Sequence, residues 1–319
     1  MKVILVTGAN KGIGQAIVKR LLAEFPDTHL LLGSRDKQRG DTAVQELLTD
    51  LGSAVKPRLE MLLLDVGNDQ SVSAAVALVK EKFGGLYGLV NNAGGWLSTD
   101  RDTIQLNAHS VVRVCEAFAP LLEADGSFTF MILVRLALIT VISGRIVQIS
   151  SAAGPSYVGK CSLGVQKMLI SEAVTFAETK TKVIEPYLNI KEDDKLTDEN
   201  KKIALEKLGL ADGAYGVAKA CVNAYTIELA RRLPRLYVNA CTPGFIATDL
   251  TKSYAEKSGK TPAEMGMKTP EEGATAAVKL TMQSLTRDES GRFYGSDALR
   301  SPMHKYRSPG APEYDGSFP

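Results

Sequence analysis

Tyr215 and Lys219 are the residues of this 319-residue chain whose types and spacing most directly suggest chemistry. They lie four positions apart in a stretch of helical period, so the phenol and the ammonium group share one helix face. A neighbouring cation favours phenolate, so the pair predicts that Lys219 lowers the pKa of Tyr215 from about 10. Such a phenol can act as a general acid. Because this spacing is common by chance, its value depends on what accompanies it.

A glycine-rich segment near the start of the chain has the pattern of a phosphate-binding turn. Residues 7–14 read Thr-Gly-Ala-Asn-Lys-Gly-Ile-Gly, between an apolar run and a helical stretch. Glycine lets backbone N–H groups approach a pyrophosphate, and a helix N-terminus adds the positive end of its dipole. The alternative is a glycine turn with no ligand, but the location of the segment between a strand and a helix favours a binding turn. The segment predicts a dinucleotide site with contacts from Gly8, Asn10, Lys11, Gly12, Ile13 and Gly14.

Charged residues after the second predicted strand indicate which dinucleotide binds. An acid at this point contacts the ribose of NAD, whereas an arginine accommodates the 2′-phosphate of NADP. Here Ser34 stands where the acid would be and Arg35 follows, with Lys11 and Arg39 able to reach the same point. Three cations favour NADP(H) through charge-assisted hydrogen bonds. We expect Asp36 to cap the next helix rather than contact ribose.

The elements that position these residues alternate between short apolar strands and longer helical stretches. We predict strands at 3–7, 29–33, 59–64, 88–91, 144–149, 236–240 and 292–294, and helices near 13–25, 37–51, 69–83, 102–123, 213–232 and 270–284. This order is typical of an α/β, Rossmann-type doubly wound parallel sheet. Since no repeat or Pro/Gly-rich linker divides it, we predict a single domain over residues 1–295 and a C-terminal tail over 296–319.

Two insertions interrupt this alternation. Residues 127–143 are strongly apolar, but they are fewer than the about 20 residues that a membrane span needs, and Arg135 lies among them. We predict a buried helix or long strand there rather than a membrane segment. Residues from about 155 to 212 are polar and helical, and we interpret their charged runs at 191–195 and 201–207 as solvated helix faces.

Three further motifs follow predicted strands, at the sheet edge where open α/β sheets bind their ligands. Residues 91–94 read Asn-Asn-Ala-Gly, residues 150–151 are a serine pair, and residues 243–248 read Pro-Gly-Phe-Ile-Ala-Thr. Together with the glycine-rich turn and the Tyr-x3-Lys pair, in this order, they resemble the short-chain dehydrogenase/reductase family. The resemblance extends to about residue 295.

The resemblance implies a role for each catalytic residue. Tyr215 would protonate the developing alkoxide as NADPH delivers hydride to a carbonyl carbon, and Ser151 would hydrogen-bond the carbonyl oxygen. Ser150 is the neighbouring candidate, but the second serine fits the family position better. Lys219 would hold the nicotinamide ribose and lower the pKa of Tyr215. Asn107 would anchor the water chain that resupplies the proton, unless it only caps or bridges backbone.

The same resemblance implies further cofactor and substrate contacts. Asp65 matches the position of the family's acid that contacts adenine, although it could instead be a residue that only forms a turn. Thr248 matches the position of the hydroxyl that lies on the carboxamide side of the cofactor. Trp96 and Phe245 directly follow motifs and are predicted to line a substrate pocket. The expected cofactor trough also includes Asn91, Ala93, Gly94, Pro243 and Gly244, together with the catalytic Tyr215 and Lys219.

Ser151 and Tyr215 are 64 positions apart, whereas they lie close together in most members of the family. A long helical insertion here resembles the monomeric carbonyl reductase subgroup, as do Asn10–Gly14 and the turn around Arg35. In that subgroup the insertion covers the helix face through which relatives oligomerise, which implies a monomer.

The apolar insertion 127–143 has no counterpart in that subgroup. Removing it joins residues 124–126 to 144–146 in an ordinary loop, so it is either a lineage-specific excursion or translated intron sequence. A native peptide spanning Arg135 would exclude the intron. A genuine insertion is expected to stand close to Ser151 and to perturb its packing.

Composition excludes several functions. The chain has 38 Lys+Arg against 36 Asp+Glu, so it lacks the broad positive surface of a nucleic-acid binder, and we expect no membrane partner.

The three histidines of the chain do not have the spacing of metal ligands, so no metal is predicted. No leader precedes the first apolar run, which favours the cytoplasm. Four widely spaced cysteines suggest reduced thiols, namely Cys115, Cys161, Cys221 and Cys241.

We therefore predict an NADPH-dependent carbonyl reductase that acts on small ketones, aldehydes or quinones. One alternative is an NADP-dependent hydroxysteroid or other alcohol dehydrogenase running in the opposite direction. Another is a non-catalytic NADP(H)-binding regulator, against which the intact set of Ser151, Tyr215 and Lys219 argues.

Overall fold

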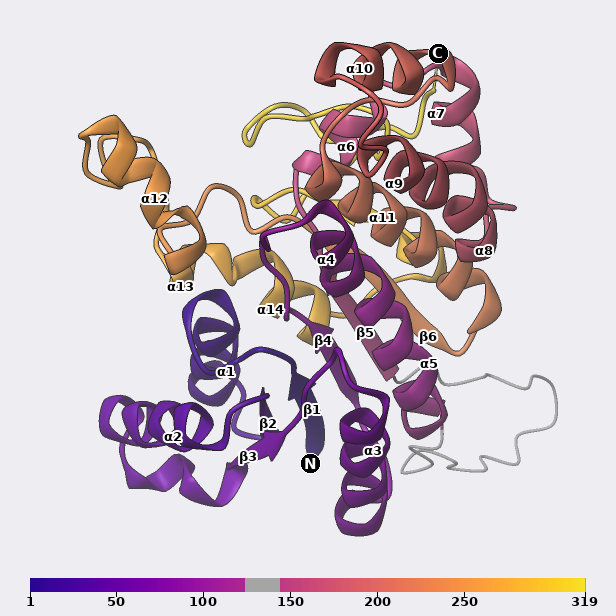
Figure 1. The fold of residues 1–319 in the computed structure, drawn as a ribbon. Coiled ribbons are helices and arrows are strands. Elements are labelled where there is room, and N and C mark those ends of the chain that lie inside the picture. The colour runs from indigo at the N-terminus through magenta and orange to yellow at the C-terminus, as the bar shows by residue number, and fades with distance from the viewer. Residues whose placement is uncertain (124–143, 319) are drawn as a thin grey trace, which may run out of the picture.

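A computed structural model of the chain describes residues 1–123 and 144–318, so the apolar segment 127–143 lies outside the described residues. An eight-stranded sheet has the order β3-β2-β1-β4-β5-β6-β7-β8. The first seven strands are parallel and β8 is antiparallel to β7, which confirms the Rossmann-type fold (Figure 1). The strands are β1 Lys2–Val6, β2 Thr28–Ser34, β3 Leu59–Leu63, β4 Gly88–Asn91, β5 Gly144–Ile149, β6 Leu236–Cys241, β7 Phe293–Tyr294 and β8 Arg300–Ser301.

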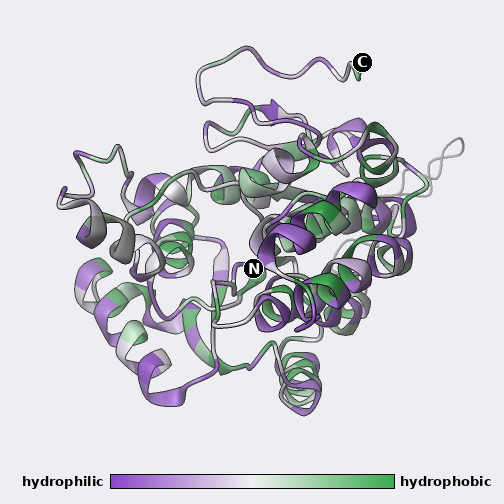
Figure 2. Ribbon diagram, turned by 45° about the horizontal axis from the view of Figure 1, so that its top comes forward, coloured by the Kyte–Doolittle hydropathy of each residue, from purple (hydrophilic) through white to green (hydrophobic). Residues whose placement is uncertain are grey.

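Helices cover both faces of the sheet. On β1, Ile4 and Val6 pack with residues of one helix layer, whereas Leu5 between them packs with the other, because successive strand side chains point to opposite faces. Hydrophobic colours follow the strands and the inward sides of the helices (Figure 2). The first layer contains α1 Gly12–Glu24, α2 Lys37–Leu51, α13 Pro270–Gly273 and α14 Thr275–Met282. The second contains α3 Asp69–Phe83, α4 Asp100–Ile104, α5 Ser110–Glu123 and α11 Ala214–Arg232.

The helical insertion predicted at 155–212 forms a series of short helices around α11. Of the 19 residues of α11, 14 are buried, so this helix is covered on nearly every side. The insertion comprises α6 Ala153–Val158, α7 Leu163–Leu169, α8 Phe176–Thr179, the π-helical turn η4 Lys180–Ile184, α9 Glu185–Lys191 and α10 Asp198–Lys207. The remaining helices are η1 Ser53–Arg58, the π-helical η2 Gln105–His109, α12 Asp249–Ser258 and η5 Arg287–Glu289.

Ion pairs anchor one charged run that the sequence indicated to be solvated. Glu192 accepts hydrogen bonds from Arg101 at the start of α4, one of them 2.8 Å long, and Lys191 pairs with Asp212 at 3.1 Å. The insertion is therefore tied to α4 and to the entry of α11 by charge as well as by apolar contacts. Sequence spacing alone could not reveal these pairs, because their partners lie far apart along the chain.

The chain enters and leaves the undescribed segment 124–143 at one place. A Cβ built on Gly144 would lie 3.1 Å from the carbonyl oxygen of Leu122, so these two residues are neighbours. Gly144 begins β5, whereas Ser151 follows its other end, and a six-residue strand spans about 20 Å. The expectation that the insertion stands close to Ser151 concerns residues outside those that the structure describes, so it stays a prediction. An extended strand separates its point of attachment from that serine.

Residues beyond 295 fold back against the last strands. Strand β8 pairs with β7, and the buried guanidinium of Arg307 forms an ion pair of 2.6 Å with Asp297. An isolated arginine and aspartate carry no periodicity, so this pair could not be predicted from the sequence. Across the two described ranges, no helix combines the length and the apolar character that crossing a bilayer requires.

Candidate active site

The glycine-rich turn between β1 and α1 is shaped so that only glycine fits at its key positions. Gly8 and Gly12 have φ of +61° and +59°, in the left-handed region that side chains rarely adopt. A Cβ on Gly14 would lie 2.4 Å from the amide nitrogen of Asn92. No side chain caps the N-terminus of α1 and no acid lies in its first turn, so its leading N–H groups face no competing side chain. These features fit a bound pyrophosphate.

Asn92, which sequence reasoning did not single out, fixes this turn to the end of β4. Its side-chain nitrogen donates to the carbonyl oxygens of Thr7 and Gly8 at 3.0 and 3.1 Å. The backbone N–H groups of Asn92 and Ala93 both donate to the hydroxyl of Thr7 at 3.0 Å. The glycine-rich turn and the Asn-Asn-Ala-Gly motif therefore form one hydrogen-bonded unit. The doubled asparagine was the only signal that could have revealed this role.

The side chain of Asn91 points elsewhere. It is buried and donates to the sulfur of Cys115 at 3.1 Å, so only its backbone is placed to line a cofactor trough. Two consecutive residues near the end of a strand point in different directions, and here the second asparagine faces the turn.

The cations predicted to read a 2′-phosphate differ in how they are held. Asp36 caps α2 by accepting from the backbone N–H of Arg39 at 2.9 Å, which confirms its capping role. The guanidinium of Arg39 lies 3.4 Å from the same carboxylate, and Lys11 pairs with Asp249 at 2.6 Å. Arg35 is exposed and has no polar partner within the described ranges. Its guanidinium is therefore open to an anionic ligand.

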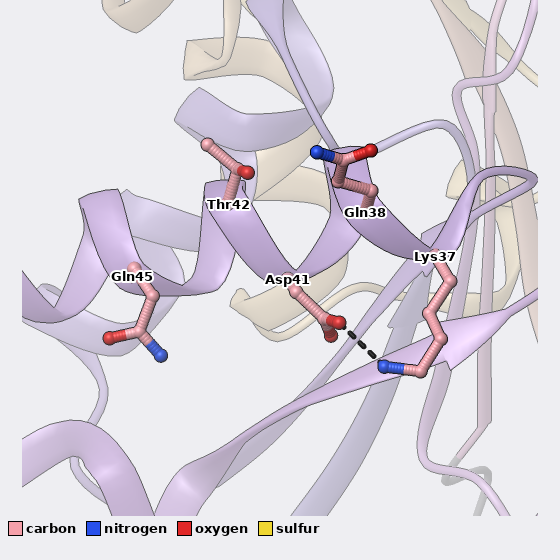
Figure 3. A pocket seen from close by; sticks show the side chains of 5 residues that line it. All are labelled: Lys37, Gln38, Asp41, Thr42 and Gln45. Carbon is pink, nitrogen blue, oxygen red and sulfur yellow. Dashed lines mark hydrogen bonds and ion pairs between the residues drawn. The ribbon is translucent and has the colours of Figure 1, made fainter.

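A surface hollow of about 510 Å³ lies against α2, next to this turn in sequence (Figure 3). Two of the side chains that line it, Lys37 and Asp41, form an ion pair whose charged atoms are 2.6 Å apart. All of its lining residues come from α2, and none is a predicted site residue: Lys37, Gln38, Asp41, Thr42 and Gln45. The hollow is separate from the catalytic residues.

Tyr215, Lys219 and Ser151 meet at the carboxyl end of β5 despite their separation in sequence. Tyr215 lies in the first turn of α11, and the nitrogen of Lys219 is 5.4 Å from the centre of its ring. Lys219 donates to the carbonyl oxygen of Ile149 at 2.9 Å, so the end of β5 holds its ammonium group. The hydroxyl of Ser151 accepts from the backbone N–H of Ala153 at 3.1 Å and lies near enough to the phenol of Tyr215 to affect its pKa.

Burial controls the protonation of both α11 groups. It raises the pKa of Tyr215 to about 12, although the nearby hydroxyl of Ser151 acts in the opposite direction. It lowers the pKa of Lys219 to about 8, against a weaker opposing effect of the nearby Cys241 thiol. The prediction that Lys219 depresses the pKa of Tyr215 is therefore wrong for this structure. The ammonium points to a backbone carbonyl, and desolvation outweighs the remaining effects.

Asn107 holds the loop that follows β4. It is fully buried in the π-helical turn η2, and its side-chain nitrogen donates to the carbonyl oxygens of Gly95 and Thr103 at 2.6 and 2.8 Å. Its oxygen accepts from the N–H of Gly95 at 3.1 Å. A Cβ on Gly94 would lie 2.7 Å from this oxygen and 3.6 Å from the nitrogen of Lys219. The side chain thus bridges backbone, as the alternative interpretation had it, close to Lys219.

The remaining predicted contacts border the same edge of the sheet. Asp65 accepts from the N–H of Gly67 at 2.9 Å, so it does form a turn after β3. Thr248 is the N-cap residue of α12, and its methyl group would lie 3.6 Å from a Cβ on Gly12. Pro243 precedes Gly244, whose φ of +94° allows the chain to turn between β6 and Thr248.

Two exposed aromatic side chains, Trp96 and Phe245, were predicted to line a substrate pocket, and one of them lies beside Tyr215. The ring of Trp96 lies 5.0 Å from that of Tyr215 at an angle of 59°. Trp96 is 40% exposed, and Phe245, after the Pro-Gly motif, is 42% exposed. Both are available to a substrate, as the pocket prediction requires.

Cysteine and histidine chemistry is not evident at this site. All four cysteines are buried and none forms a disulfide. Within residues 1–123 and 144–318, no three His, Cys, Asp or Glu side chains gather in a way that could hold a metal ion.

Comparison with known proteins extends these observations. A model of the short chain dehydrogenase family matches residues 2–163. Carbonyl reductase (NADPH) 1 of Mus musculus is 32% identical over 295 residues, which cover 88% of this chain and 90% of that protein. Menthone neomenthol reductase from Mentha piperita has a similar structure, with a TM-score of 0.68, 26% identity and coverage of 92% of this chain and 98% of the other. Salutaridine reductase from Papaver somniferum gives a TM-score of 0.69, 25% identity and coverage of 92% and 99%.

Proposed function

Because the chain belongs to the short-chain dehydrogenase family and matches its carbonyl reductases, we propose that it reduces ketones, aldehydes or quinones to alcohols with NADPH. The observation that carries this proposal is the convergence of Ser151, Tyr215 and Lys219 beside a glycine-rich turn suited to pyrophosphate. A protein that only bound the cofactor would need the turn and Arg35 but not a phenol and a serine hydroxyl near each other.

The proposed reaction assigns one task to each of these side chains. NADPH supplies the hydride when bound, and Ser151 orients the carbonyl oxygen toward the phenol. Tyr215, with a pKa of about 12, is protonated at neutral pH and can give its proton to that oxygen. Lys219 holds the ribose side of the cofactor with its ammonium group. The predicted part of Asn107 in a water chain stays a prediction, as do the adenine contact of Asp65 and the carboxamide contact of Thr248.

The same residues can run the reverse oxidation of an alcohol, because the phenolate would then accept the proton that the phenol donates. The hydroxysteroid or alcohol dehydrogenase alternative therefore differs in direction and substrate, not in machinery. The cytoplasmic location of the protein and its organisation as one domain, with a boundary near residue 295, also stay predictions.

The direct test is oxidation of NADPH by the purified protein with a panel of ketones, aldehydes and quinones. We expect one alcohol formed for each NADPH consumed. Tight NADPH binding without turnover on any member of the panel would instead support the non-catalytic regulator.

We expect Arg35→Asp to remove the preference for NADPH over NADH. An exposed guanidinium without a protein partner can meet the 2′-phosphate, and a hydrogen bond between charged groups contributes about 1.5–3 kcal/mol, roughly a tenfold to hundredfold preference. The measurement is the ratio of kcat/KM for the two cofactors.

Lys37→Asp is the matched control for Arg35→Asp. It makes the same change of charge two residues later, at an ammonium already paired with Asp41. We expect the cofactor ratio of this control to stay within about twofold of the original protein. An unchanged ratio in Arg35→Asp would refute the assignment of Arg35 to the 2′-phosphate.

We also propose that the protein is a monomer. The insertion packs on α11, and 14 of the 19 residues of this helix are buried, so the helix through which relatives of the family pair is largely covered here. Light scattering coupled to size-exclusion chromatography should give the mass of one 34.3 kDa chain. A stable dimer or tetramer would contradict the proposal.

A further inference from the structure

Trp96 stands out among the exposed residues because it faces the proposed proton donor. Its ring centre lies 5.0 Å from that of Tyr215, within the range of favourable aromatic pairs, and 40% of its surface is exposed. It is also the only tryptophan in the chain. A large, flat, solvent-accessible ring therefore borders the position where a carbonyl group must approach the phenol.

The backbone on both sides of Trp96 is anchored. Gly95 exchanges two hydrogen bonds with the buried amide of Asn107, and the N–H of Leu97 donates to the hydroxyl of Thr103 at 3.0 Å. Asn107 and Thr103 belong to the continuous segment of α4 and η2. Trp96 is thus held between two fixed points, so the conformational entropy of placing its ring is lost on folding rather than on substrate binding.

We propose that Trp96 is a specificity-determining residue that favours flat, conjugated carbonyl compounds over saturated ones of similar size. The inference rests on the proposed function. An aryl or quinone ring stacks on the exposed part of the indole while its carbonyl oxygen reaches Tyr215 and Ser151. A saturated ring makes the same apolar contact but lacks a π face. Aromatic pairs gain enough beyond apolar contact to change kcat/KM by about three- to tenfold.

Competing explanations of the exposed ring predict different behaviour. If Trp96 only shields Tyr215 from water, its loss should slow every substrate by a similar factor. If it only adds apolar surface, leucine should replace it for both classes. Only stacking predicts a loss confined to conjugated substrates and a rescue by phenylalanine.

The test compares acetophenone with cyclohexyl methyl ketone, which differ in the aromaticity of one ring. We expect Trp96→Leu to lose about three- to tenfold in kcat/KM for acetophenone and less than twofold for the saturated ketone. Trp96→Phe should retain most of the preference. Leu97→Ala, an exposed neighbour on the same loop, should change neither substrate by more than twofold. Equal losses on both ketones in Trp96→Leu would overturn the proposal.

Fluorescence separates this proposal from the proposed function. Because the chain has one tryptophan, its emission reports on residue 96 alone. Titration with acetophenone should quench it at concentrations where cyclohexyl methyl ketone does not, with free tryptophan amide as the reference for collisional quenching. Selective quenching without turnover would leave the stacking site intact but refute the reductase. Turnover of both ketones with no selective quenching would refute the stacking site alone.

Discussion

Tyr215→Phe should lower carbonyl-dependent oxidation of NADPH by about two to four orders of magnitude, the usual contribution of a positioned general acid. The substitution removes only the phenol hydroxyl, near Ser151, and leaves the ring that packs against Trp96. With a pKa of about 12, the phenol carries its proton throughout the neutral range, so its loss removes the acid itself. The measurement is kcat with a saturating carbonyl substrate.

The matched control is Tyr157→Phe. This tyrosine is buried in α6, beside Gly216, and the change deletes the same hydroxyl from a ring outside the proposed reaction path. We expect the rate of Tyr157→Phe to stay within about twofold of the original protein, whereas Tyr215→Phe, which keeps the ring, should still bind NADPH. Equal rates in Tyr215→Phe and the original protein would show that another group donates the proton.

The second large effect is expected from pH. In the free protein the pKa of Lys219 is about 8, so its ammonium is present below that pH and is lost above it. If this charge holds the cofactor, kcat/KM for NADPH should be constant below about pH 8 and fall roughly tenfold per pH unit above it, because kcat/KM reports on the free enzyme. Tyr215 does not interfere, since its pKa is about 12.

Lys219→Arg provides the control for that profile. A guanidinium keeps its charge throughout the range, so the variant should show a lower but pH-independent kcat/KM between pH 7 and about 10. A profile that is flat to pH 10 in the original protein would contradict the assigned role of the ammonium. A break that persists in Lys219→Arg would assign it to another group.

The sequence predicted most of the framework because its signals are local. Every predicted strand lies within one residue of an observed one, since short apolar runs bounded by turns are clear when both sheet faces are buried. The capping role of Asp36 was also predictable, because a cap depends on its own helix. The order of motifs along the strand ends likewise indicated which edge of the sheet holds the candidate site.

What the sequence could not reveal depends on contacts between distant residues. It did not indicate which of Asn91 and Asn92 faces the glycine-rich turn, because that depends on how the chain leaves β4. The pKa of Tyr215 was misjudged because four-residue spacing brings Lys219 near the ring but does not reveal burial or the carbonyl of Ile149. Helical spacing places groups on one face, whereas desolvation depends on the whole fold.

The contact between Leu122 and Gly144 has a practical consequence. Two internal points of a chain that already touch can be joined by a short turn or by a long inserted sequence at nearly the same entropic cost, since the entropy of loop closure grows slowly with loop length. The attachment point is one strand length from Ser151, at the opposite edge of the sheet. The connection between Leu122 and Gly144 is therefore a suitable insertion site for a fluorescent domain or an immobilisation tag, because its two ends are distant from the catalytic residues.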